Sequence, residues 1–319
     1  MSRVAAVDIG TNSVRLLVAD VSGPGREAVL TTIERRTQIT RLGQGVNESR
    51  RLDPEAIART VGVLTEYQAV IAAHDVSRVR MTATSASRDA TNRDEFFDPV
   101  EQVMGLRPEL LSGEDEASLE FLGATAGLAA PAGLGATAGL AAPEPYLVVD
   151  VGGGSTEFIA GVDQPSELMS IDVGCVRLTE QFLHSDPPSP EELSVAVSVV
   201  RDHLTDVDRT VTGAAHAKTL IGTAGTVWTM GAIELGVDAS DSERIHHFRL
   251  SRAAAEEIFR TLATEPVSRR KHNPGLEPGR VDVIVGGAVV VVSILRHFGF
   301  PEMLVSEADI LDGLARSLG

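Results

Sequence analysis

Residues 4–15 read VAAVDIGTNSVR, and residues 146–157 read YLVVDVGGGSTE. In each stretch an apolar strand ends in an Asp, and one aliphatic residue, a Gly-containing polar turn and a returning strand follow. Two strands joined by a short polar turn predict a β-hairpin. The two stretches lie one near the start of each half of the chain.

The two turns are typical of a phosphate site and not of a dinucleotide site. In a dinucleotide-binding fingerprint a helix follows the glycines, whereas here an Asp precedes them and a strand follows. Glycine lets several backbone N–H groups point at a ligand and lets that ligand approach closely. The residues predicted to bind phosphate in this way are Gly10, Thr11, Asn12, Ser13, Gly152, Gly153, Gly154, Ser155 and Thr156.

Asp8 and Asp150 end the two strands, where their carboxylates could hold Mg²⁺ directly or through water. For either motif alone, a tight hairpin turn without a ligand is the better interpretation. The matched pair, each with an Asp at the strand end, favours a functional site.

The remaining chain mixes strands and helices throughout, which predicts the α/β class. Strands are predicted at 3–8, 14–19, 78–83, 146–150, 157–162, 219–222 and 303–306. Helices are predicted at 53–73, 190–209, 251–263, 281–298 and 308–318, with others starting at 113 and near 179 and 226. Asp53 followed by Pro54 marks a capped helix start.

Composition excludes several classes of protein. The chain has 319 residues, enough for two ordinary domains, and a net charge of −17. That charge argues against nonspecific nucleic-acid binding but not against a local phosphate site. Cys175 is the single cysteine, so we expect no disulfide framework and no thiolate metal site. The longest apolar run, residues 283–295, is shorter than the ~20 residues of a membrane helix, and the N-terminus has no signal-peptide pattern. A cytoplasmic protein without a membrane partner is expected.

A short tandem repeat separates the two halves. GATAGLAAP occurs at 123–131 and again at 135–143. Two copies of so short a unit do not make a solenoid, and a duplication in a tolerant Ala/Gly-rich segment explains them better. We expect residues 123–145 to be a linker.

These motifs, in this order, resemble the exopolyphosphatase/guanosine pentaphosphate phosphatase (Ppx/GppA) family of the actin-like sugar kinase/Hsp70 superfamily. The matching stretches are DIGTNSVRLLV at 8–18, TSASRDATN at 84–92, SGEDEA at 112–117, VVDVGGGSTEF at 148–158, GCVRLTEQF at 174–182, GTAGT at 222–226 and RVDVIVGGAVV at 280–290. The resemblance implies two actin-like (ribonuclease H-like) domains with an interdomain cleft. Domain I would comprise residues 1–122 plus 301–319, and domain II residues 146–300. Longer relatives carry a further C-terminal helical half, so this chain resembles the short, two-domain form.

The resemblance also implies a reaction in which water attacks the terminal phosphoryl group of a polyphosphate. Glu116 would be the general base, and Asp150 and Glu157 would lie on the Mg²⁺ side of the site. From the residues alone, the acids at 114–116 could equally be a solvated helix start favoured by the helix dipole. Arg88 is a candidate clamp for phosphate oxygens, with an exposed arginine at a helix entry as the alternative.

Several further residues carry weaker signals. Arg15, Arg41, Arg93 and Arg177 are lesser phosphate-binding candidates, and GTAGT is either an anion-suited helix start or a packing turn. The basic stretch at 269–272 is better explained as a solvated loop than as a guide for a polyanion. His246 and His247 lack metal-ligand spacing and are interpreted as structural.

The predicted function is a Mg²⁺-dependent exopolyphosphatase that releases orthophosphate from inorganic polyphosphate, with short chains preferred. A close alternative is a phosphohydrolase acting on guanosine pentaphosphate. Others are an ATP-dependent kinase of the same superfamily and an inactive sensor that binds guanosine pentaphosphate or tetraphosphate. The oligomeric state is left open, with a homodimer as one alternative.

Overall fold

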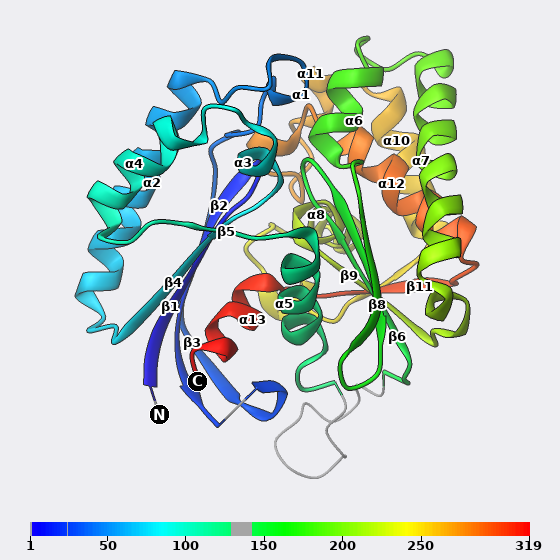
Figure 1. The fold of residues 1–319 in the computed structure, drawn as a ribbon. Helices are drawn as coiled ribbons and strands as arrows, with labels where there is room; N and C mark the ends of the chain where they lie inside the picture. Colours follow the sequence, from blue (N-terminus) through cyan, green and yellow to red (C-terminus); the bar gives the residue numbers. More distant parts are fainter. Residues whose placement is uncertain (1, 24, 129–141) are drawn as a thin grey trace. The chain divides into compact units, whose positions relative to one another are not determined.

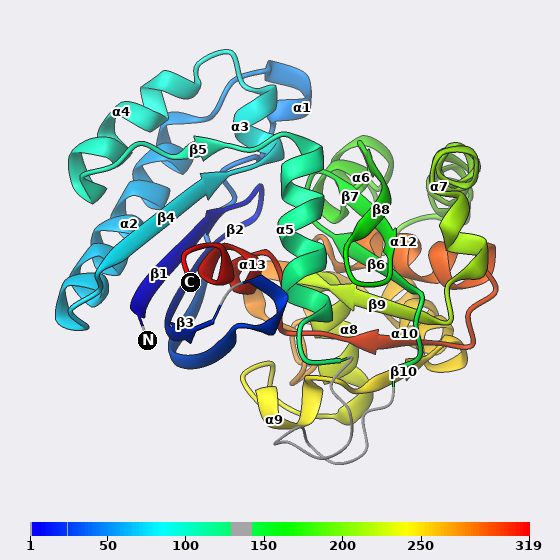
Figure 2. The ribbon, with the colours of Figure 1, turned by 60° about the horizontal axis from the view of Figure 1, so that its bottom comes forward.

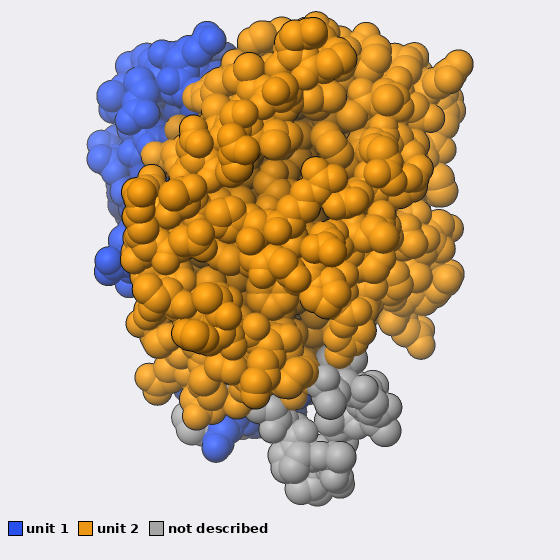
Figure 3. Space-filling view, turned by 90° about the vertical axis from the view of Figure 1, so that its right-hand side faces the viewer, with its two compact units in different colours: residues 1–127, 308–319 blue, residues 128–307 orange. Residues whose placement is uncertain are grey.

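The computed structural model describes residues 2–23, 25–128 and 142–319, which divide into two compact units (Figures 1 and 3). Unit 1 comprises Met1–Gly127 and Ala308–Gly319, and unit 2 comprises Leu128–Glu307. Residues 129–141, which hold most of the predicted linker and its duplication, lie outside the described residues.

Unit 1 is built on a five-stranded sheet with the order β3-β2-β1-β4-β5 (Figure 2). Its strands are β1 (Ser2–Ile9), β2 (Ser13–Ser22), β3 (Val29–Ile39), β4 (Arg78–Ala83) and β5 (Glu109–Leu110). The first three strands pair antiparallel, whereas β4 runs parallel to both β1 and β5. The hairpin predicted for the first motif is therefore confirmed.

Unit 2 repeats this arrangement in a six-stranded sheet with the order β8-β7-β6-β9-β11-β10. Its strands are β6 (Tyr146–Val151), β7 (Thr156–Gly161), β8 (Pro165–Ile171), β9 (Thr219–Thr223), β10 (Arg249–Ser251) and β11 (Glu302–Val305). An antiparallel meander again leads into parallel strands, and β10 adds an antiparallel edge. Both sheets have the ribonuclease H-like strand order, so the predicted α/β, actin-like class is confirmed.

The place of β11 corrects one predicted boundary. The sequence predicts residues 301–319 in domain I, but β11 pairs parallel with β9 and antiparallel with β10 in the sheet of unit 2. The chain returns to unit 1 at Ala308 because β11 finds its hydrogen-bonding partners in the second sheet.

Alternation along β1 sends side chains to two different cores in unit 1. Ala5, Val7 and Ile9 pack under helices α2 (Pro54–Ala73) and α4 (Arg93–Met104). The intervening residues, Val4 and Ala6, pack against α13 (Ile310–Ser317) on the other face. Because both faces of the sheet are covered, the strand is a continuous apolar run.

Helices cover the sheet of unit 2 around a single large hydrophobic core (Figure 1). They are α6 (Cys175–Phe182), α7 (Pro190–Thr210), α8 (Ala224–Leu235), α10 (Arg252–Thr264) and α12 (Ile284–His297). Helix α12 packs against α6, α7, α8 and α10 and is buried along most of its length, which explains the long apolar run near the end of the sequence.

Side chains cap several helix starts, and the cap predicted at Asp53 is confirmed. The Asp53 side chain accepts hydrogen bonds from the first turn of α2, and Ser189 forms a capping box at α7. Helix α5 (Gly113–Thr125) begins after Ser112, whose hydroxyl accepts from the Asp115 amide at 3.1 Å. The short helices are α1 (Val46–Ser49), α3 (Ser85–Asp89), α9 (Ser242–Ile245) and α11 (Val267–Arg270), with 3₁₀ turns η1 (Gly25–Glu27), η2 (Thr212–His216) and η3 (Pro278–Arg280).

Strand β3 was not predicted from the sequence. Its segment VLTTIERRTQI lacks the apolar run of a buried strand because β3 lies at the sheet edge, with much of its surface half-exposed. Charged side chains are common on edge strands, where they discourage pairing with another chain. In the described part of the chain, no helix is both long and apolar enough to span a membrane.

Candidate active site

The two Asp–Gly turns have the same backbone geometry. The Gly10 amide donates to the Ser13 carbonyl at 3.0 Å, and the Gly152 amide donates to the Ser155 carbonyl at 3.1 Å. A Cβ built on Gly10 would lie 3.3 Å from that carbonyl oxygen, and one on Gly152 would lie 3.0 Å from its counterpart. Neither glycine has a positive φ, so close approach of the backbone, and not a left-handed conformation, favours glycine here.

The first turn is held from behind by residues 40–43. The Thr40 and Arg41 amides donate to the Asn12 carbonyl at 3.0 and 2.9 Å, and the Gly43 amide donates to the Thr11 carbonyl at 2.8 Å. The carbonyl groups of the turn thus already accept hydrogen bonds from the protein backbone. The Thr11 and Asn12 amides donate to no acceptor within the described ranges, which leaves them available to an anion.

The second turn is held in the same way by α6. Amides at the start of α6 donate to the Gly152 and Gly153 carbonyls at 2.9–3.1 Å, and Arg177 Nε donates to the Gly154 carbonyl at 2.8 Å. These carbonyls satisfy the first N–H groups of the helix in place of a side-chain cap. The helix therefore starts at Cys175, earlier than the sequence predicts.

The carboxylates next to the two turns have opposite partners. At the same position of the two hairpins, Asp8 stands opposite Arg15, and Asp150 stands opposite Glu157. An Asp–Arg pair neutralises itself, whereas two acids facing each other across strands are unfavourable without a cation or a proton. The two motifs that look alike in sequence are therefore electrostatically different.

In unit 1, Arg15 takes the place where a metal was predicted. Arg15 Nη2 donates to Asp8 Oδ2 at 2.7 Å, and Thr82 Oγ1 donates to Asp8 Oδ1 at 3.4 Å. Burial raises the pKa of Asp8 above its ordinary value, and the neighbouring Arg15 partly offsets this rise. Asp8 as a Mg²⁺ ligand remains a prediction, and the arginine at its carboxylate makes it the weaker part of the predicted metal set.

In unit 2 the donor set suits a hard cation better. Asp150 and Glu157 are 7% and 1% exposed, and Ser170 Oγ donates to Glu157 Oε1 at 2.8 Å. No cluster of three or more His, Cys, Asp or Glu side chains that could hold a metal is found among the described residues. Mg²⁺ commonly binds through one or two carboxylates and keeps several waters, so this pair fits it.

The predicted clamp and the predicted base form an ion pair. Arg88 Nη1 donates to Glu116 Oε2 at 2.7 Å and to the Leu111 carbonyl at 3.0 Å. Glu116 is only 9% exposed, whereas Glu114 and Asp115 are exposed. This difference separates Glu116 from the solvated helix start that the sequence left open as an alternative.

Helix α3 connects the first turn to this ion pair. Ser85 at its start shares a 2.7 Å hydrogen bond with Thr11, and Arg88 on the same helix reaches Glu116. Two further polar side chains in this region, Asn12 and Ser87, are buried without a hydrogen-bond partner among the described residues. Buried polar groups normally find partners, so these two point to a ligand or water at the turn.

The basic stretch at 269–272 is not a uniformly solvated loop. Arg270 is buried, and its guanidinium donates to Asp186 Oδ1 at 2.6 Å and to the Val281 carbonyl at 3.3 Å. The interpretation as a solvated loop is wrong for Arg270, because the carboxylate of Asp186, which is far away in the sequence, neutralises its charge. Lys271 and His272 are exposed.

Two charged residues near the motifs were missed. Arg280 is buried against Gly225 of the GTAGT turn, where a Cβ would lie 2.0 Å from the guanidinium carbon. Asp309, which forms an ion pair with Arg15, is also not among the site residues predicted from the sequence. Arg280 lies inside a matched motif, which could have drawn attention to it, whereas no sequence signal marks the contact of Asp309.

Comparison with known proteins shows which family the chain belongs to. Residues 17–318 match the Ppx/GppA phosphatase family. The chain belongs to this family. Its membership confirms the resemblance seen in the motifs and the prediction that the protein is an enzyme.

Relatives matched over nearly their full length support the same family assignment. It is 43% identical to Exopolyphosphatase 2 of Mycobacterium tuberculosis, over 100% of this chain and 99% of the relative. A crystal structure of an exopolyphosphatase-like protein is 36% identical with a TM-score of 0.90, covering 99% of this chain and 98% of that chain. The Aquifex aeolicus PPX-GPPA enzyme is 31% identical with a TM-score of 0.78, covering 99% of each chain.

Proposed function

We propose that this protein is a Mg²⁺-dependent exopolyphosphatase that removes terminal orthophosphate from inorganic polyphosphate. The observation that carries the proposal is the Arg88–Glu116 ion pair, joined through α3 to a turn whose Thr11 and Asn12 amides are available to an anion. The name of the 43% identical relative supports the same substrate.

In the proposed reaction the first turn and Arg88 bind the oxygens of the terminal phosphoryl group. Arg88 has further N–H groups besides the one that donates to Glu116, so it can hold the base and the substrate together. Glu116 accepts a proton from a water molecule as the water oxygen attacks phosphorus. The bridging P–O bond breaks, and its electron pair stays on the shortened chain.

Asp150 and Glu157 are proposed to hold the cation. Bound Mg²⁺ would neutralise charge on the phosphoryl oxygens, which is the main requirement of a loose, metaphosphate-like transition state. Within the protein, Ser170 orients Glu157 through its hydroxyl, and the turn at 152–155 supplies backbone donors. Variants in either unit should therefore impair the same reaction.

A direct assay tests this function against its alternatives. Phosphate release is measured from polyphosphate, guanosine pentaphosphate and ATP, with and without Mg²⁺. We expect polyphosphate to be the best substrate and release to require Mg²⁺. Preference for guanosine pentaphosphate would replace the proposed substrate, and binding without hydrolysis would indicate a sensor.

Glu116→Gln tests the base. We expect kcat to fall by about 10²-fold or more with the fold intact, because a positioned base contributes about that much. Glu114→Gln, an exposed acid two positions earlier, is the matched control and should stay within twofold. Loss of activity in the control with an active Glu116→Gln would assign the wrong carboxylate as base.

Substrate length is the finer part of the proposal. The net charge of −17 opposes a long polyanion on the outer surface, and the basic stretch at 269–272 has one of its arginines neutralised by Asp186. We expect a preference for short chains and a distributive mode. Resolving the products of a long polyphosphate partway through digestion should show gradual shortening of all chains. Untouched long chains beside free phosphate would indicate processive action.

A further inference from the structure

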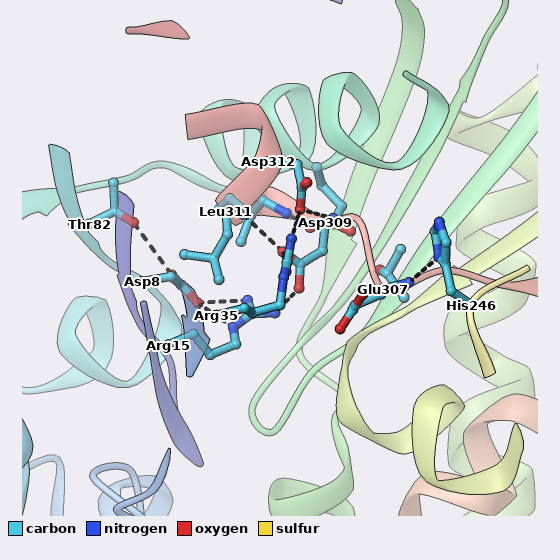
Figure 4. A network of polar contacts seen from close by, with 12 residues as sticks. Asp8, Arg15, Arg35, Thr82, His246, Glu307, Asp309, Leu311 and Asp312 are labelled. Carbon is cyan, nitrogen blue, oxygen red and sulfur yellow. Dashed lines mark hydrogen bonds and ion pairs between the residues drawn. The ribbon is translucent and has the colours of Figure 1, made fainter. Parts of the chain in front are cut away.

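Asp309 lies at the meeting point of three elements of unit 1 (Figure 4). It is the N-cap of α13, where its Oδ1 accepts the Leu311 amide at 2.9 Å and its own amide donates to Asp312 Oδ2 at 3.2 Å. Its other carboxylate oxygen, Oδ2, accepts a hydrogen bond from Arg15 Nη1. Arg15 therefore holds two buried carboxylates, Asp8 on β1 and Asp309 on α13.

The same turn of α13 packs directly against α5, the helix that carries the proposed base Glu116. A Cβ on Gly123 of α5 would lie only 1.8 Å from the Asp309 carbonyl oxygen, so the two backbones are in direct contact. Glu120, one helical turn after Glu116, is buried and accepts the Ile310 amide at 2.8 Å. Helices α5 and α13 lie side by side in both ribbon views (Figures 1 and 2).

The other end of this chain of contacts reaches the phosphate turn. Arg15 donates through Nε and Nη2 to Asp8, and a Cβ on Gly10 would lie 3.9 Å from the same Asp8 oxygen. Asp309 thus stands between the turn at 10–13 and Glu116, connected to the turn by a buried ion pair and to α5 by backbone contact.

We propose that Asp309 is a positioning residue for hydrolysis, which acts by holding Arg15 and thereby fixing the first phosphate turn relative to Glu116. This inference rests on the proposed function for its catalytic readout. A displaced turn would present the phosphoryl group at the wrong distance from the base, and small misplacements of reacting groups are expensive in rate. Asp312 lies in the same helical turn, but its Oδ2 accepts a hydrogen bond from Arg35 Nη2 at 2.6 Å and none from Arg15. Arg35 also lies near Asp309, with Nη1 3.9 Å from Asp309 Oδ1.

Asp309→Asn isolates the charge from the cap. Asparagine is as good an N-cap as aspartate, so the Leu311 amide keeps its acceptor while the carboxylate facing Arg15 is lost. We expect kcat for polyphosphate to fall about tenfold, with KM within about threefold, because misplacing reacting groups by about 1 Å can cost up to about 10²-fold in rate. Asp312→Asn, the matched control, should leave kcat within twofold even if it lowers the melting temperature equally.

A double-mutant cycle identifies the route of the effect. If Asp309 acts through Arg15, kcat of Arg15→Gln should not fall further when Asp309→Asn is added. Additive losses, or equal kcat losses in Asp309→Asn and Asp312→Asn at equal melting temperature, would overturn the proposal by showing a merely structural role.

Hydrogen exchange gives a readout that does not depend on activity. Asp309→Asn should speed amide exchange in peptides covering residues 8–15 and the start of α5, whereas Asp312→Asn should speed it in α13 alone. If the wild-type protein fails to hydrolyse polyphosphate but exchange follows this pattern, the proposed function is wrong and the connection stands. Unchanged exchange at 8–15 would overturn the connection itself.

Discussion

Arg88 uses one nitrogen, Nη1, to hold both Glu116 and the Leu111 carbonyl. Its Nε and Nη2 groups donate to no acceptor within the described ranges, and its side chain is partly open to solvent. A guanidinium can therefore orient the base with one edge and meet phosphate oxygens with the other. The planar fork, and not the charge alone, makes this double role possible.

Arg88→Lys should separate charge from geometry at this position. Lysine keeps the positive charge but is a point donor without the fork, so we expect kcat/KM for polyphosphate to fall by about tenfold or more. Arg78→Lys, an exposed arginine at the start of β4, is the control and should change nothing beyond twofold. A fully active Arg88→Lys enzyme would show that a nearby charge suffices.

At the scale of elements, α5 and α13 pack with backbone against backbone. Gly123 meets the Asp309 carbonyl, and Gly313 on α13 meets the Leu119 carbonyl of α5, where a Cβ would lie 2.0 Å away. Each helix thus supplies one glycine to let the other approach. The contact needs glycine for space and not for an unusual φ, since neither residue has a positive φ.

Alanine at either glycine should loosen this pair. A methyl group cannot fit at these distances without moving a backbone, so Gly123→Ala and Gly313→Ala are each expected to destabilise unit 1 by about 3 kcal/mol. Gly62→Ala, in the exposed interior of α2 with nothing within 4 Å, should instead stabilise by about 0.5–1 kcal/mol. Thermal and denaturant unfolding measure the difference. Equal stability of all three variants would show that the helices separate easily.

At the scale of the whole molecule, acid should weaken unit 2 through His247. Burial and the neighbouring His246 ring, 3.6 Å away between centroids, lower the pKa of His247 to about 4. An ordinary histidine takes up its proton near pH 6.5, so between about pH 6.5 and 4 the unfolded chain binds more protons than the folded protein. The stabilising effect is complete above pH 6.5 and is lost as the pH falls toward 4.

His247→Asn should remove part of this acid sensitivity. Asparagine tolerates the positive φ of 65° found at this residue. Allowing for the part of the ring that solvent reaches, we expect the wild-type protein to lose about 1–2 kcal/mol more than the variant between pH 7 and 4. His272→Asn, at an exposed histidine, is the control. Parallel stability curves for wild type and His247→Asn would contradict the assignment.

Short-range patterns determined much of this protein from sequence alone. The two hairpins, the Asp–Gly turns and the cap at Asp53 depend on residues within a few positions of one another, so a short stretch of sequence is enough to predict them. The order of the motifs was also sufficient to identify the family. The sequence did not predict edge strand β3, because pairing with β2, and not its own residue pattern, makes this segment a strand.

Only the tertiary structure decided which charges meet. Arg15 pairs with Asp309, 294 positions away, and Arg88 pairs with Glu116, 28 positions away. Two turns of nearly the same sequence acquired different electrostatics, because the residue opposite the Asp is an arginine in one hairpin and a glutamate in the other. Burial and pairing set the state of an ionisable group, and both depend on chain segments that no local pattern specifies.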